Sequence, residues 1–169
     1  MDGEYCDRFP SGENNHDLVT VVFFKKAETE QTEFSFDLQG SRAAWAIMTA
    51  IHGVDVTDPV RYVETESCDG EATSVFPSIE DGRIGDILLL SMAFDDAASS
   101  ERFGPPPDTE LLGYESGYDE TGILFGKRLF EDGPTGVFET DGSGGQRTST
   151  SGGIKCKDAL ISMTLKPAP

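Results

Sequence analysis

Residues 85–94 read GDILLLSMAF, and this stretch decides the fold class. Its last eight positions carry no charge, and seven of them are apolar. The pair Gly85-Asp86 comes before this run and Asp95-Asp96 follows it, so turn-forming residues bound it on both sides. A bounded apolar run of this length is typical of a strand that is buried on both faces. The sequence therefore predicts the central strand of a β-sheet here.

Further strand signals lie on both sides of the central strand. LVTVVFF, at residues 18–24, is rich in β-branched and aromatic residues. In TEFSFDL, at residues 32–38, apolar and polar residues alternate as they do in a half-buried strand. We expect these two segments to form a hairpin. The other strand signals lie at residues 74–76, 122–130, 137–138 and 154–165, and around Tyr62.

Residues 42–52 form a segment that can be interpreted in two ways. Its alanines favour a helix. Read as a strand, it would have both faces covered, with Trp45, Ile47, Thr49 and Ile51 on one face and Ala44, Ala46, Met48 and Ala50 on the other. We favour the strand because Gly53 and the Asp58-Pro59 turn follow at once.

The pattern as a whole predicts an all-β chain. Seven or more short strands, separated by turn signals and with no convincing long helix, are typical of an antiparallel β-sandwich or a jelly-roll-like fold with long loops and little helix. The length of 169 residues suits one domain with one core. We place this domain at residues 17–169, after a polar N-terminal arm or loop at residues 1–16. The three prolines at residues 105–107 predict an extended surface loop.

The charge of the chain narrows the choice of partners. It has 31 acidic and 13 basic residues, with a formal net charge of −18. A surface of this kind repels phosphate backbones and anionic lipid headgroups, so neither nucleic acid nor a membrane is an expected partner. The first residues lack the basic and apolar regions of a signal peptide, and the apolar runs are too short to span a bilayer.

The motifs of common catalytic sites are missing from the sequence. Its two histidines, His16 and His52, have no metal-ligand spacing, and two distant histidines cannot supply the cluster of a jelly-roll metalloenzyme. There is no GxSxG elbow, no phosphate-binding loop and no dinucleotide-binding motif. Cys6, Cys68 and Cys156 lie far apart and are best interpreted as isolated thiols. We therefore expect neither an enzyme nor a cofactor.

Two kinds of ligand remain open. The acidic pairs in residues 55–58, 95–96 and 119–120 have the oxygen ligands of a structural calcium site, although solvated charge is the preferred interpretation because no EF-hand spacing occurs. Tyr114 and Tyr118, which we place in a polar loop with Gly113 and Gly117, are the candidate ligand-contact residues, as rings on which a sugar could stack. Phe103 and Trp45 are weaker candidates, and Trp45 is better explained as a core residue.

Five stretches, taken in order, resemble a β-sandwich domain that recurs in tailed-bacteriophage structural proteins and in phage-derived bacterial genes. They are VVFFKKA at residues 21–27, TEFSFDL at 32–38, AAWAIMTAIHGVDVTDPV at 43–60, GDILLLSMAF at 85–94 and ALISMTLKP at 159–167. Each motif is short, and their order carries the resemblance. The first GDLLL-type strand and the GW turn of the family pattern have no counterpart here.

The resemblance implies a non-enzymatic virion structural protein on the exterior of a tailed bacteriophage. This would be a capsid decoration (cement) subunit or a tail-fibre component, assembled in the host cytoplasm, with other virion proteins and further copies of itself as partners. The missing first strands imply that the N-terminal arm or a neighbouring subunit covers an open sheet edge. The alternative function is a carbohydrate-binding module that recognises host surface glycans through Tyr114 and Tyr118.

Overall fold

Antiparallel strands make up the regular structure of the residues that the computed structural model describes, which are 3–9, 18–27, 46–67, 75–94, 105–117, 120–139 and 158–169. These residues contain no helix. The all-β antiparallel class predicted from the sequence is confirmed. The strands are β1 (Gly3–Phe9), β2 (Leu18–Phe24), β3 (Val60–Ser67), β4 (Val75–Phe76), β5 (Ile87–Phe94), β6 (Glu110–Gly117), β7 (Glu120–Arg128), β8 (Phe138–Glu139) and β9 (Asp158–Leu165).

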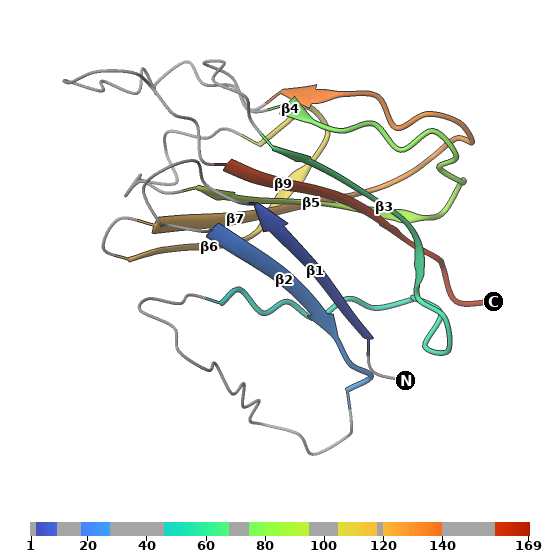
Figure 1. The fold of residues 1–169 in the computed structure, drawn as a ribbon. Coiled ribbons are helices and arrows are strands. Elements are labelled where there is room, and N and C mark those ends of the chain that lie inside the picture. The colour runs from blue at the N-terminus through green and yellow to red at the C-terminus, as the bar shows by residue number, and fades with distance from the viewer. Residues whose placement is uncertain are drawn as a thin grey trace.

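A five-stranded sheet with the order β3-β9-β5-β7-β6 is the centre of the fold (Figure 1). β5 lies in its middle and pairs antiparallel with both β7 and β9, as the apolar run at residues 85–94 predicts. Side chains alternate across a strand, so Leu88 and Leu90 point to one face of the sheet while Leu89 points to the other. All three are buried, which explains why seven of the eight residues in the run are apolar.

Each face of this sheet carries its own hydrophobic cluster. On one face, Phe76 of β4 and Phe138 of β8 join the cluster of Leu88 and Leu90, and the rings of Phe76 and Phe125 meet edge to face with their centroids 6.4 Å apart. On the other face, Val22 of β2 packs on the second cluster. Figure 1 shows the β1–β2 ribbon (blue) on one side of the sheet and β4 on the other. The two covering sheets have two strands each, so a sandwich of two large sheets stays a prediction.

β-bulges mark both edges of the five-stranded sheet. On β3, Val60 and Tyr62 pair with the consecutive residues Leu165 and Thr164, so Arg61 is the extra residue. On β6, Leu111 and Gly113 pair with Phe125 and Leu124, so Leu112 is the extra residue. A bulge shifts the inward and outward alternation by one position and re-aims the side chains around it. Arg61, at the bulge of β3, bonds to Asp86, and Leu112, at the bulge of β6, packs against the second cluster.

Gly113 and Gly126 make room for close packing on the face that carries the second cluster. A methyl group at Gly126 would lie 2.6 Å from Leu112 Cδ1, and one at Gly113 would overlap Ile47. Gly113 belongs to β6, so the prediction of a polar loop at this residue is wrong. A strand with two glycines gives a weak sequence signal, and β6 depends on its pairing with β7.

The N-terminal part of the fold differs from the prediction in its pairing. Gly3–Phe9 lies within the predicted arm or loop but forms β1, which pairs with β2 along its whole length. The expected hairpin partner of β2, residues 32–38, lies outside the described residues. β4, β5 and β9 fall within segments where the sequence predicts strands, and β3, β7 and β8 overlap such segments.

Residues 46–52 belong to no strand, but side-chain burial alternates along them as it does in an extended chain. Ile47, Thr49 and Ile51 are half-buried, whereas Ala46, Met48 and Ala50 are exposed. The predicted period of two is therefore present. The prediction of a strand with both faces covered was wrong for these residues, because one face is open and the backbone is not part of a ladder.

The proline loop is a turn that fixes the start of β6. Thr109 donates its backbone N–H to the carbonyl of Pro106 at 3.1 Å, and Asp108 between them has φ of 61°. A proline at the second position of a turn and a residue of positive φ at the third are typical of type II turns. Pro105 and Pro107 are exposed, as expected for a surface loop, whereas Pro106 is buried and holds the loop against the protein.

Replacing Gly113 by alanine tests the packing of residues 46–51 on β6. We expect Gly113→Ala to lower the free energy of unfolding by about 1–3 kcal/mol, because the new methyl group overlaps Ile47. In an Ile47→Ala background the same change should cost much less, because the overlapping atoms are gone. Urea unfolding of the four proteins in this cycle measures the difference. Equal costs of Gly113→Ala in both backgrounds would contradict this packing.

Candidate functional site

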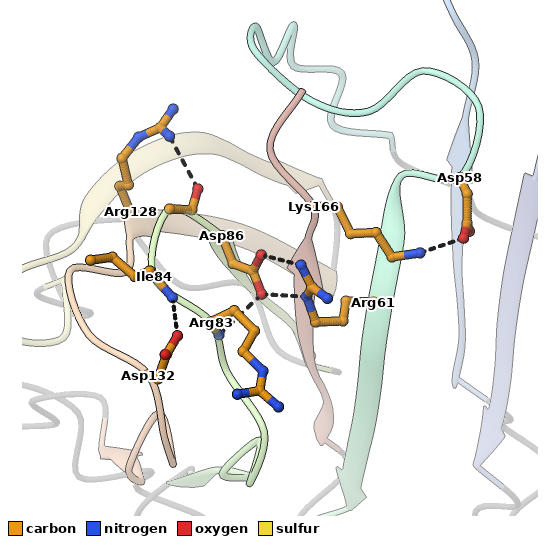
Figure 2. Close-up of polar contacts among 9 residues, drawn as sticks. Asp58, Arg61, Arg83, Ile84, Asp86, Arg128, Asp132 and Lys166 are labelled. Atoms are coloured by element: carbon orange, nitrogen blue, oxygen red, sulfur yellow. Dashed lines mark hydrogen bonds and ion pairs between the residues drawn. The ribbon is translucent and has the colours of Figure 1, made fainter. Parts of the chain in front are cut away.

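Charged and polar residues gather at one end of the five-stranded sheet (Figure 2). β3 and β5 begin at this end, and β7 and β9 finish at it, because neighbouring strands run antiparallel. Figure 2 shows Asp86 at the centre, with Arg61 turned towards it and Arg83 beside it. The other labelled residues of this sheet-end cluster are Asp58, Ile84, Arg128, Asp132 and Lys166.

Asp86 is the buried centre of the sheet-end cluster. Its side chain has no exposed surface. Its two carboxylate oxygens accept hydrogen bonds from Arg61 Nε at 2.8 Å and Nη2 at 3.1 Å, and one of them also accepts from the backbone N–H of Arg83 at 3.2 Å. The bidentate pair holds the guanidinium in one orientation. By accepting these side-chain hydrogen bonds, Asp86 raises the pKa of Arg61 above its ordinary value.

The ion pair joins two strands that are not neighbours. β9 lies between β3, which carries Arg61, and β5, which follows directly after Asp86. The bulge at Arg61 re-aims its side chain, and Arg61 reaches Asp86 past the end of β9. Asp86 thus fixes the edge strand β3 to the beginning of the central strand. The ion pair of Arg61 and Asp86 is called the clamp below.

The turns at residues 79–86 and 129–135 pair with each other next to this clamp. Leu129 donates its N–H to the carbonyl of Asp86 at 2.8 Å, and Gly133 donates to Gly82 at 2.9 Å. Ile84 N–H donates to Asp132 Oδ1 at 2.8 Å, and Arg128 Nη1 donates to the carbonyl of Gly85 at 3.1 Å. These bonds hold two exposed apolar side chains in place at the sheet end, Ile84 at 63% and Phe130 at 82% exposure.

The role of Asp86 in the sheet-end cluster is structural. A catalytic base or a metal ligand needs an oxygen within reach of a substrate or an ion, but Asp86 is fully buried and already accepts three hydrogen bonds. The second ion pair, between Lys166 and the exposed Asp58, joins the end of β9 to the loop before β3. The cluster therefore locks the strand ends together.

The acidic loop at residues 55–58 organises itself through hydrogen bonds. Asp55 Oδ1 accepts from Thr57 Oγ1 at 2.7 Å, from Thr57 N–H at 2.8 Å and from Asp58 N–H at 3.3 Å. The hydrogen bond from the Thr57 hydroxyl is the main reason why the pKa of Asp55 lies below its ordinary value. The described residues contain no group of three or more metal-ligating side chains. Residues 95–96 and 119 lie outside the described residues, so the calcium site stays a prediction.

The two candidate sugar-contact tyrosines have different positions. Tyr114 lies on β6 rather than in a loop, and its half-buried ring packs against the cluster of Leu88 and Leu90. Tyr118, Phe103, Trp45 and His16 lie outside the described residues. His52 is exposed at the end of the extended segment. A ligand contact by either tyrosine therefore stays a prediction.

Sequence reasoning missed the pair of Arg61 and Asp86. Asp86 was recognised as one half of a turn, and nothing in the local pattern distinguishes it from the other 30 acidic residues of the chain. The pairing depends on a bulge and on the crossing of β9, which are properties of the assembled sheet.

Comparison with known protein families, curated proteins and solved structures found no match to this chain. The resemblance to the phage β-sandwich domain therefore stays a prediction. Within the described residues, no helix is long and apolar enough to cross a membrane.

Removing the charge of Asp86 should be far more costly than removing that of Asp58. We expect Asp86→Asn to lower the free energy of unfolding by about 3 kcal/mol, because Arg61, whose side chain is only 28% exposed, loses its counter-charge. Asp58→Asn breaks the surface pair with Lys166 and should cost at most about 1 kcal/mol. Urea unfolding at neutral pH measures both values. Similar losses in the two variants would rule out the clamp.

The turn at Asp55 should depend on pH. Because the pKa of Asp55 is lowered in the folded protein, its hydrogen bonds stabilise the fold above the ordinary value of 3.8 and are lost as the pH falls through the lowered value. Thr57→Val should move the pKa of Asp55 up towards 3.8, whereas Thr57→Ser keeps the hydroxyl and should move it less. Carboxyl-carbon NMR titration follows this residue directly. An Asp55 pKa that is unchanged in Thr57→Val would contradict the assigned cause.

Proposed function

We propose that this protein is a non-enzymatic structural component on the exterior of a tailed-bacteriophage particle, either a capsid decoration (cement) subunit or a tail-fibre component. The observation that carries the proposal is the agreement between the resemblance and the strands. Three of the five stretches that resemble the phage β-sandwich domain, at residues 21–27, 85–94 and 159–167, contain residues of β2, β5 and β9. These strands contribute to one packed unit. Such agreement supports the proposal through fold, which by itself does not determine function.

The construction of the sheet also supports a structural role. β5 is buried on both faces, and the sheet end is locked by a bidentate ion pair. A rigid scaffold whose polar groups stabilise one another is suited to a structural role on the surface of a particle.

The charge distribution supports the exterior position. With a net charge of −18, the chain is repelled by the packaged genome and kept soluble before assembly. Its proposed partners are other virion proteins and further copies of itself, and its proposed site of assembly is the host cytoplasm.

The location of the protein on particles tests the proposal. In particles purified from the strain that carries the gene, mass spectrometry should detect the protein, and antibodies against it should label intact particles in electron microscopy. Labelling over the head would indicate decoration, and labelling of the tail would indicate a fibre component. A host cytosolic protein, which must be missing from the same gradient fraction, is the control. If the protein stayed in the soluble lysate and was missing from purified particles, the proposal would be wrong.

A further inference from the structure

The extended segment at residues 46–52 lies on the sheet face that carries the second cluster. Ile47 sits over Gly113 of β6, and Ile51 packs on the cluster of Met163 and Leu165. These inward side chains fix the segment on the sheet. The outward side chains Ala46, Met48 and Ala50 are exposed, with Met48 at 70%.

The backbone of this segment has unused hydrogen-bonding capacity. The amide and carbonyl groups of residues 46–52 make no hydrogen bond with any described residue. The first backbone hydrogen bonds after the segment join Gly53 to Ala168 and Asp55 to Lys166. An extended segment that is held by its side chains, and whose backbone groups have no partner among the described residues, can pair with an added strand.

The two edge strands of the five-stranded sheet differ from the segment at residues 46–52. β3 and β6 each contain a bulge. Their exposed glutamates, Glu64 and Glu66 on β3 and Glu110 and Glu115 on β6, add repulsion. Bulges and charges are the usual means by which proteins discourage unwanted strand pairing. The segment at residues 46–52 has neither.

The distribution of charge along the chain favours a second copy of the chain as the partner of this segment. Residues 43–54 are the longest stretch of the sequence without Asp, Glu, Lys or Arg, in a chain of net charge −18. A second copy of the chain is repelled wherever two acidic surfaces meet, and this stretch adds no charge to that repulsion. An antiparallel pair about a two-fold axis also satisfies itself, because each copy offers the other the same donors and acceptors.

We infer that residues 46–52 are a strand-addition site for a second copy of this chain. With the two-fold axis at Met48, Met48 lies opposite its counterpart, and Ala46 lies opposite Ala50 of the other copy. The small alanines let the two backbones approach on either side of the methionines. The inference rests on the geometry of this segment and holds whether or not the protein belongs to a virion.

The association should be weak and salt-dependent. One pair of short strands buries less area than the roughly 1,200–2,000 Å² of a stable interface, so we expect a monomer–dimer equilibrium that moves towards dimer as the protein is concentrated. Salt screens the repulsion between the two acidic chains, so the dimer should strengthen between about 0.02 M and about 0.5 M NaCl.

Sedimentation velocity of the full chain over a range of concentrations at both salt levels tests the site. Met48→Glu places like charges opposite each other at the two-fold axis and should weaken the association about tenfold or more. Met48→Leu keeps an apolar side chain and should stay close to the unchanged protein. Phe130→Glu is the matched control, because it adds the same charge at an exposed apolar position at the sheet end, and it should leave the association almost unchanged.

Amide hydrogen exchange locates the contact. Protection of residues 46–52 should rise with protein concentration in the unchanged protein and not in Met48→Glu. Urea unfolding of each variant shows that the monomer is intact. A chain that stays monomeric at every concentration and salt level would overturn the inference. A dimer that is lost in Phe130→Glu and kept in Met48→Glu would also overturn it, because the interface would then lie at the sheet end.

Discussion

The burial of β5 on both faces is the constraint on which the rest of the structure depends. A strand in the middle of a sheet gives its backbone groups to its two neighbours, here β7 and β9, and its side chains then require cover above and below. The pair of β4 and β8 supplies this cover on one face, and the β1–β2 ribbon with residues 46–51 supplies it on the other. The covering elements are short, and their positions follow from the apolar surface that they bury.

The burial of β5 also constrains the turn before it, because this turn must leave the hydrophobic core covered. Asp86 is buried there, and a buried carboxylate is tolerated only when it is paired and hydrogen-bonded. Arg61 provides the pairing from an edge strand, and the bulge at that residue is the local distortion that makes the contact geometrically possible. The edge strand, the central strand and the turn are therefore coupled through one ion pair.

The sequence predicts those elements whose own side chains specify them. The apolar run of β5 and the alternation in β9 predict strands whatever lies beside them. β1 is polar and charged, and β6 contains two glycines, so both depend on their partner strands and give little local signal. The clamp could not be predicted at all, because its two residues are 25 positions apart and meet only after β9 is inserted between their strands. Tyr114 lies on β6, and the weak signal of this glycine-containing strand is the reason why the sequence predicts a loop there.

The strong net charge and the neutral segment at residues 43–54 have a common physical meaning. A chain of charge −18 repels its own copies over most of its surface, which keeps it soluble and suppresses indiscriminate contact. Any specific contact between copies must then use a surface where this repulsion is weak and where unsatisfied groups provide attraction. Residues 46–52 meet both conditions, since they are uncharged and their backbone has no partner among the described residues. The same acidity that discourages pairing at the sheet edges thus favours association at this uncharged segment.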